Sequence, residues 1–140
     1  MKRKLNCVLL IDDDEPTNFL NKMIIEDTGC VREVKVTQSA REALDYLSGR
    51  QQLTDGDKPP TPEIIFLDIN MPAMDGWEFL ERYDKLSPEQ KASMIVVMLT
   101  TSFNPEDELK ASKISYISSY QNKPLTQEIL MDIFEEHFGS

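Results

Sequence analysis

The sequence predicts an α/β fold with a doubly wound, five-stranded parallel sheet and helices on both of its faces. Three short apolar runs lack alternation with polar residues, at positions 7–11, 64–67 and 94–99. Such runs are typical of parallel strands covered on both sides. Between them, apolar residues recur at helical spacing. Strands that alternate with helices make βα units, and right-handed crossovers then favour the flavodoxin-like strand order 2-1-3-4-5.

Two further strands are expected at residues 31–36 and 114–120, where apolar residues partly alternate with polar ones. This weaker pattern indicates strands nearer the edges of the sheet. The segment 49–62 is rich in Gly, Pro and polar residues, and we expect it to be an exposed loop.

The expected helices differ in how much apolar surface they can bury. A capping box of Ser39 and Glu42 begins the second helix, and the third is expected at about residues 75–83. Asn104 begins the fourth as its N-cap, before a first-turn proline. The body of the fourth helix is almost entirely polar, so it has little to bury. The fifth has a clear apolar stripe, made of Leu125, Ile129, Leu130, Ile133 and Phe134.

Length and charge limit the classes of function. The 140 residues have the size of one domain, which we place at residues 1–140. The net charge of −10 repels nucleic-acid phosphates, so we expect no direct DNA binding. No apolar stretch is long enough for a membrane span or a signal peptide, and we therefore expect a cytoplasmic protein. Cys7 and Cys30 lack metal-ligand spacing and are expected to be free thiols.

Residues with reactive side chains follow four of the predicted strands. Asp12 and Asp13 follow the first strand, Asp68 follows the third, Thr100 ends the fourth and Lys123 follows the fifth. In a doubly wound parallel sheet the carboxyl ends of the strands form one crevice, where these groups should meet.

The charges of this set favour a divalent cation. Three close carboxylates carry −3, which is costly unless they are neutralised or protonated. Lys123 supplies +1 and one Mg²⁺ would supply +2. Hard oxygen ligands, few in number, are what Mg²⁺ takes. A carboxylate beside such an ion is a competent nucleophile towards a phosphoryl group. Taken alone, however, the acidic run at residues 12–14 is equally consistent with a solvated cap of the first helix.

The motifs resemble those of the receiver domains of two-component response regulators. The spaced string D-x-x-M-P-x-x-D-G is specific by itself and stands here at residues 68–76. The four matching motifs lie in the family's order along nearly the whole chain: VLLIDDDEPTN at 8–18, FLDINMPAMDG at 66–76, VVMLTTS at 96–102 and YQNKP at 120–124.

The resemblance implies a role for each matching position around the acids. Asp68 is implied to be the phosphoacceptor. Asp12 and Asp13 are implied to hold Mg²⁺ together with Asp68, Asp12 directly or through a water, and the backbone carbonyl of Asn70 completes the metal site. The donor is implied to be a sensor histidine kinase or a histidine phosphotransfer protein. The domain itself catalyses only its own phosphorylation and slow autodephosphorylation, and passes the signal to a downstream protein that the sequence leaves unidentified.

The remaining implied roles concern the switch. Thr100 turns its hydroxyl to the phosphoryl oxygens, Lys123 pairs with the phosphoryl group or Asp68, and Tyr120 swings inward as the second switch residue. From its position alone, Tyr120 can equally be a half-buried packing residue. The sequence departs from the family pattern where Tyr116 and the next residue replace Gly-Ala, and where Thr101 replaces a smaller residue.

Two other functions compete with the phosphorylatable switch. A Mg²⁺-dependent phosphatase or mutase also forms an aspartyl phosphate, but such enzymes usually carry a second acid two residues after the nucleophile, where this chain has Asn70. A receiver-like module that binds partners without phosphorylation would have lost an acid, the threonine or the lysine, and all of these are present.

Overall fold

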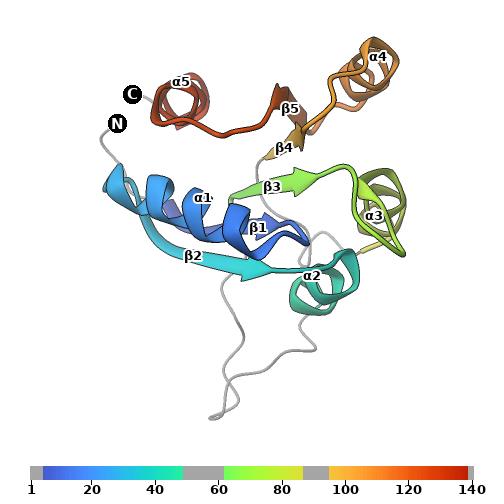
Figure 1. Cartoon of the computed structure of the whole chain (residues 1–140), viewed down its shortest axis with the longest axis horizontal. Helices are drawn as coiled ribbons and strands as arrows, with labels where there is room; N and C mark the ends of the chain where they lie inside the picture. Colours follow the sequence, from blue (N-terminus) through green and yellow to red (C-terminus); the bar gives the residue numbers. More distant parts are fainter. Residues whose placement is uncertain (1–4, 49–61, 87–94, 139–140) are drawn as a thin grey trace.

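The computed structural model describes residues 5–48, 62–86 and 95–138, which form one parallel sheet flanked by helices (Figure 1). The sheet order is β2-β1-β3-β4-β5 and all four strand pairings are parallel. The predicted fold class and strand order are therefore confirmed. The strands are β1 (Leu5–Ile11), β2 (Val31–Thr37), β3 (Ile64–Asp68), β4 (Ile95–Thr100) and β5 (Ile117–Asn122).

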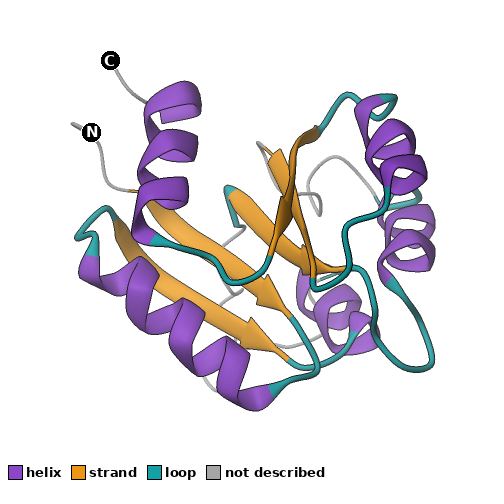
Figure 2. Cartoon of the chain, turned by 45° about the horizontal axis from the view of Figure 1, so that its top comes forward, coloured by secondary structure: helices purple, strands orange, loops and turns teal. Residues whose placement is uncertain are grey.

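Helices cover both faces of the sheet, as Figure 2 shows. Alternate residues of each strand point to opposite faces, so the apolar runs supply two separate cores. Leu9 and Ile65 face one core and Leu10 and Phe66 the other. The first core is covered by α2 (Ala40–Leu47), α3 (Gly76–Tyr83) and α4 (Pro105–Ser112), and the second by α1 (Glu15–Asp27) and α5 (Gln127–Phe138).

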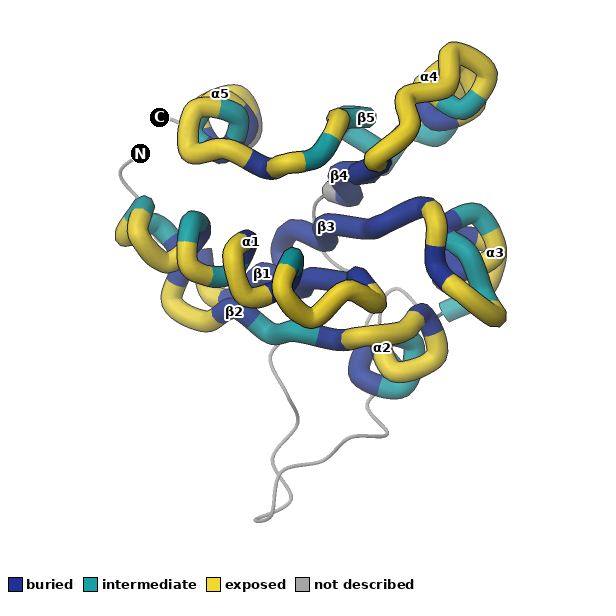
Figure 3. Tube along the Cα trace, in the orientation of Figure 1, coloured by how far each residue is buried: buried dark blue, intermediate teal, exposed yellow. Residues whose placement is uncertain are grey.

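Burial falls from the centre of the sheet towards β5 (Figure 3). Every residue of β3 is buried, and in β1 all residues but Asn6 are buried. The residues of β5 are half-buried, apart from the exposed Asn122. In α4 the buried residue is Ala111, which agrees with the polar composition of this helix.

The position of β5 differs from the prediction. The apolar residues Ile114 and Tyr116 favoured a strand over 114–120, but β5 begins at Ile117. After α4, the backbone N–H of Ile114 donates to the carbonyl of Ala111, and that of Ile117 to the carbonyl of Ile114. Residues 113–116 are therefore a turn, and its apolar side chains pack against the core beside α3.

The capping boxes also differ from the prediction. Ser39 caps α2 by accepting from the backbone N–H of Glu42, but the Glu42 carboxylate accepts from the N–H of Gln38 instead of that of Ser39. A full capping box occurs at α3, where Asp75 and Glu78 each accept from the other's backbone N–H.

The loop between β3 and α3 lies very close to the end of β3. A Cβ at Gly76 would lie 2.9 Å from the Cα of Ile69 and 3.1 Å from the carbonyl oxygen of Asp68, so only glycine permits this approach. The N–H of Gly76 donates to the carbonyl of Ile69 at 2.8 Å. Ala73 takes a left-handed φ of 67° in the same loop. The segment at residues 69–76 therefore folds back closely against the end of β3.

The expectation of free thiols is confirmed. Cys7 and Cys30 are free thiols, and burial raises the pKa of Cys7 to about 11. Among the described residues, no helix is long and apolar enough to cross a membrane. The loop predicted at 49–62 lies outside the described residues, except for Pro62.

Candidate functional site

Three carboxylates meet at the carboxyl edge of the sheet. Asp12 follows β1 and Asp68 ends β3, and these neighbouring strands run in register, with Ile11 beside Leu67. One carboxylate oxygen from each of Asp12, Asp13 and Asp68 lies within 4.8 Å of the others. Asp12 and Asp68 are buried, whereas Asp13 is exposed. The crevice therefore opens to solvent on the side of Asp13.

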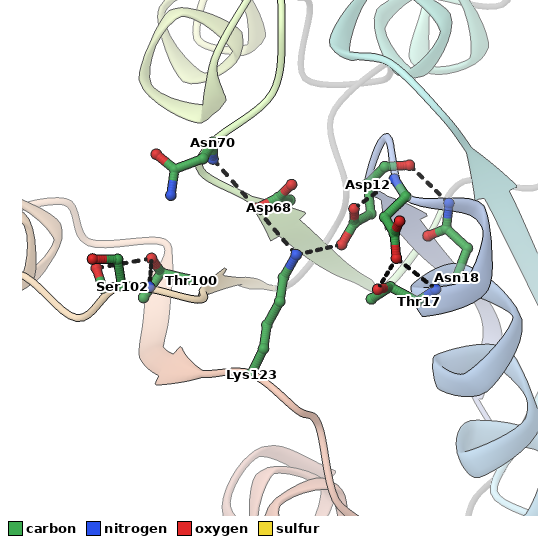
Figure 4. A network of polar contacts seen from close by, with 9 residues as sticks. Asp12, Thr17, Asn18, Asp68, Asn70, Thr100, Ser102 and Lys123 are labelled. Atoms are coloured by element: carbon green, nitrogen blue, oxygen red, sulfur yellow. Dashed lines mark hydrogen bonds and ion pairs between the residues drawn. The ribbon is translucent and has the colours of Figure 1, made fainter.

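Lys123 reaches into this cluster from the end of β5 (Figure 4). Its Nζ lies 2.7 Å from Oδ2 of Asp12 and 3.3 Å from Oδ1 of Asp68. Its backbone N–H donates to the carbonyl of Thr100 at 2.8 Å, which ties the end of β5 to the end of β4. One ammonium group thus bridges the two buried acids.

The site carries excess negative charge even with this lysine. Burial, followed by repulsion from Asp12, raises the pKa of Asp68 to about 6. Burial opposes the charge of Lys123, but its hydrogen bond to Asp12 and the attraction of both acids outweigh this and raise its pKa. Lys123 therefore stays protonated, and a divalent cation would neutralise the charge that the three carboxylates still carry. The cluster of oxygen ligands and its charge fit Mg²⁺.

Thr100 is buried at the end of β4, but its hydroxyl is engaged away from the acids (Figure 4). Oγ1 donates to the carbonyl of Ser102 at 3.1 Å and accepts from the N–H of Ser102 at 3.0 Å. A new acceptor at Asp68 would have to compete with this local turn for the hydroxyl proton.

Tyr120 lies on β5 and contacts the loop before α4. Its hydroxyl accepts from the backbone N–H of Asn104 at 3.2 Å, and its ring meets Phe103 edge-on at 5.1 Å between centroids. Asn104 is the N-cap of α4. The half-buried Tyr120 therefore packs against the entry of α4, and its role as a moving switch stays a prediction.

Two asparagines complete the surroundings of the acids. The backbone N–H of Asn70 donates to Oδ1 of Asp68 at 3.3 Å, while its carbonyl as a metal ligand stays a prediction. Asn18 was not among the predicted site residues, but it is buried and donates from Nδ2 to the carbonyl of Asp12 at 2.7 Å. Its place at the end of the motif VLLIDDDEPTN, one helical turn after the acids, was the available signal.

Comparison with known proteins identifies the family. The chain matches the family model of the response regulator receiver domain over residues 8–135. It is 30% identical over 128 residues to the response regulator Rcp1 of Synechocystis sp., covering 91% of this chain and 81% of that protein. It is also 30% identical over 129 residues to the probable methanogenesis regulatory protein FilR2 of Methanothrix harundinacea, covering 92% and 79%.

A solved structure gives the same answer for the fold. The crystal structure of a two component response regulator from Cytophaga hutchinsonii matches with a TM-score of 0.82 and 34% identity, over 96% of this chain and 97% of that one. The identity and the nearly complete coverage of both chains extend the agreement from the fold to the family. The chain therefore belongs to the response regulator receiver family of two-component signalling proteins.

Proposed function

We propose that this protein is a phosphorylatable switch that accepts a phosphoryl group from a phosphohistidine onto Asp68, with Mg²⁺ held by Asp12, Asp13 and Asp68. The observation that carries the proposal is the convergence of these carboxylates around the Nζ of Lys123. A cluster made only for stability would be better built from apolar residues, because burying like charges is costly.

The residues supply the parts of a phosphoryl transfer. An oxygen of Asp68 forms the new bond to phosphorus, and the bond from phosphorus to the histidine nitrogen breaks, leaving its electron pair on the imidazole. Lys123 already contacts Asp68 and can pair with the phosphoryl oxygens. Bound Mg²⁺ would neutralise the developing charge on these oxygens. The backbone N–H of Asn70 orients the nucleophile.

The same geometry disfavours turnover of an external substrate. The mutase and phosphatase alternative needs an acid two residues after the nucleophile to protonate the leaving group. Asn70 stands there with an exposed amide side chain, which cannot act as a general acid. We therefore propose that the only catalysis is phosphorylation of the domain itself and slow loss of the phosphoryl group.

The test uses a small phosphodonor with Mg²⁺, followed by intact-mass measurement. The parent protein should gain one phosphoryl group that is stable in acid and lost in hydroxylamine, as an acyl phosphate is. Asp68→Asn should gain none, and Asp13→Asn should bind Mg²⁺ much more weakly in calorimetry. Equal labelling of Asp68→Asn and parent would identify another acceptor and overturn the proposal.

The donor should dock where an apolar surface meets the acidic site. A groove of about 390 Å³ runs between α1 and the loop after β5, and Lys123 is among the residues that line it, with Leu20, Ile24 and Leu125. On α1, the side chains of Phe19, Leu20 and Met23 are exposed by 67%, 51% and 43%. A phosphohistidine that reaches Asp68 brings its protein against this surface, and exposed apolar side chains are suited to such a contact.

Phosphotransfer from two donors separates docking from chemistry. Phe19→Ser should slow transfer from a purified histidine phosphotransfer domain but leave labelling by the small phosphodonor unchanged. Leu109→Ser, at an exposed site on α4, is the matched control and should change neither rate. Equal transfer from the protein donor to Phe19→Ser and to parent would exclude this surface.

A further inference from the structure

Asn18 is buried in a place where its amide group touches the acidic turn. It lies in the first turns of α1 with 2% of its surface exposed. Its Nδ2 donates to the carbonyl oxygen of Asp12 at 2.7 Å (Figure 4). This carbonyl belongs to the peptide group that joins Asp12 to Asp13. The contact therefore holds the link between two of the three acids.

Fixing this peptide plane sets the direction in which the Asp13 side chain leaves the backbone. Other hydrogen bonds hold neighbouring groups of the turn: the N–H of Asp12 donates to the carbonyl of Thr37 at 3.2 Å, and the N–H of Asp14 to Oδ1 of Asp12 at 2.9 Å. These contacts fix Asp12, whose carboxylate is also held by Lys123. Asp13 is exposed, and the peptide on its amino side is the one that Asn18 holds.

The helix start explains why Asn18 can reach this carbonyl. Asp14 is the N-cap of α1, and its carboxylate accepts from both the N–H and the hydroxyl of Thr17. The N–H of Asn18 then donates to the carbonyl of Asp14 at 3.1 Å. Helical side chains lean towards the N-terminus, so the Asn18 amide points back at the end of β1.

The carbonyl oxygen of the Asn18 amide argues against a role in packing alone. Its Oδ1 is buried and, within the described residues, has no hydrogen-bond partner. A buried acceptor without a partner is unfavourable, and leucine has a similar size without this cost. An asparagine here therefore needs a benefit beyond filling space. The hydrogen bond to the Asp12 carbonyl supplies one, because it satisfies this acceptor and holds its peptide group in one orientation.

We propose that Asn18 is a positioning residue that holds the Asp12–Asp13 peptide so that both carboxylates face one magnesium ion. The inference rests on the proposed function, because it assumes the metal site. Groups that orient metal ligands from behind typically change metal affinity by about 10–100-fold when they are removed. Because Asn18 acts on the backbone and Asp12 has other anchors, we expect the lower end of this range.

The test measures Mg²⁺ affinity by calorimetry, with thermal unfolding as a check on folding. Asn18→Leu should weaken Mg²⁺ binding about tenfold. Asn18→Ala should weaken it less, because a water can enter and donate to the Asp12 carbonyl. The matched control is Asn21→Leu, at a buried asparagine in the next turn of α1, and it should leave the affinity within about twofold of the parent.

The outcomes separate the inference from the proposed function. Unchanged affinity in both Asn18 variants, or equal losses in Asn18→Leu and Asn21→Leu, would overturn the positioning role and leave the metal site in place. A parent protein that binds no Mg²⁺ would overturn the metal site itself. If Asn18→Leu does not fold, Asn18→Ala alone decides, since an affinity equal to that of the parent contradicts the inference.

Discussion

The two ends of the carboxyl edge of the sheet differ in how deeply their residues are buried. Asp12 follows β1 and Asp68 ends β3, and the residues of these strands are almost all buried. Tyr120 stands on the half-buried β5, beside α4, where Ala111 is the buried residue. The acids are also held by Lys123 and by backbone N–H groups. The side chain of Tyr120 accepts a hydrogen bond from Asn104, contacts the ring of Phe103 and packs at the margin of the first core.

This contrast separates a fixed reaction centre from a region that can respond to it. Phosphoryl transfer needs the nucleophile and its charge partners in place beforehand. A switch needs the reverse, an element whose packing free energy is small enough for a few kcal/mol to change its position. Burial fixes the reaction centre at the ends of β1 and β3. The polar composition of α4 leaves that helix weakly packed, as a switch element requires.

The largest expected effect is a difference in stability between two leucine truncations. Leu67→Ala on the buried β3 should lower the free energy of unfolding by about 2–5 kcal/mol, because it leaves a cavity. Leu109→Ala on α4, where the side chain is 59% exposed, should change it by less than about 0.5 kcal/mol. Urea unfolding measures both. Similar losses would mean that α4 is packed as firmly as the centre of the sheet.

The next prediction concerns the buried carboxylate of Asp68 and how its charge affects stability at different pH. The pKa of Asp68, raised to about 6 from 3.8, means that the folded state binds this proton more tightly than the unfolded state. Without Mg²⁺, stability should therefore fall as the pH rises from about 4 to 6. Asp68→Asn should escape this loss and exceed the parent by about 1–2 kcal/mol at pH 7.

Urea unfolding across this pH range, with a chelator present, tests the prediction. The advantage of Asp68→Asn should disappear near pH 3, where the parent carboxyl is protonated in both states. Asp13→Asn is the control, because Asp13 is exposed and should gain less. If Asp68→Asn were less stable than the parent at pH 7, the ion pair with Lys123 would outweigh the cost of burial and repulsion.

The sequence predicted the fixed half of the molecule far better than the responsive half. The apolar runs at β1, β3 and β4 predicted the sheet, because short runs without polar alternation are typical of strands buried on both faces. The same topology predicted that Asp12, Asp68 and Lys123 meet at one edge of the sheet. Strand ends follow from the chain order, and the order of a parallel sheet is strongly constrained.

Local side-chain contacts were beyond such patterns. The residues Ile114 and Tyr116 had the alternation of a strand, but they belong to a turn that packs beside α3. That Thr100 turns its hydroxyl to the phosphoryl group after transfer stays a prediction, and the sequence did not indicate that this hydroxyl is bonded to Ser102 beforehand. Asn18 was missed because one asparagine on a helix carries no periodic signal. The packing of Ile114 and Tyr116 depends on tertiary contacts, and the other two cases depend on individual side-chain hydrogen bonds. Propensity and spacing contain neither.

The coupling between the two halves predicts a change in hydrogen exchange. A phosphoryl mimic with Mg²⁺ would offer Thr100 new acceptors and draw its hydroxyl from Ser102. The loop before α4, which carries Asn104 and contacts Tyr120, should then move. Exchange within residues 101–120 should change by about tenfold or more, equivalent to about 1.4 kcal/mol of local stability, while β1 stays protected.

Thr100→Ala separates this coupling from binding of the mimic. The variant should still bind the mimic at Asp68 but lose the exchange change in residues 101–120. Identical exchange with and without the mimic in the parent protein would show that the two halves are not coupled through Thr100.

The smallest expected effect lies at Tyr116, where the family pattern has a glycine. Its hydroxyl donates to Oδ1 of Asp84 at 2.8 Å, and its ring lies 5.4 Å from that of Tyr83, centroid to centroid. Burial, then the bond to Asp84, raises the pKa of Tyr116, so the donor proton is retained. Among the described non-glycine residues, Ala73 is the one with a positive φ. Tyr116 therefore fits this turn without the left-handed backbone conformation that would strain a residue with a side chain.

The contacts of Tyr116 with Asp84 and Tyr83 tie the turn before β5 to the end of α3. Tyr116→Phe keeps the ring and loses the hydrogen bond, and it should cost about 0.5–1 kcal/mol because the pair is exposed on one side. Exchange should rise mainly in residues 113–117, next to the freed ring, while labelling of Asp68 stays as in the parent. Tyr116→Gly should raise exchange further, since it also removes the contact with Tyr83. If Tyr116→Phe altered neither stability nor exchange, the turn before β5 would be held by its backbone and not by α3.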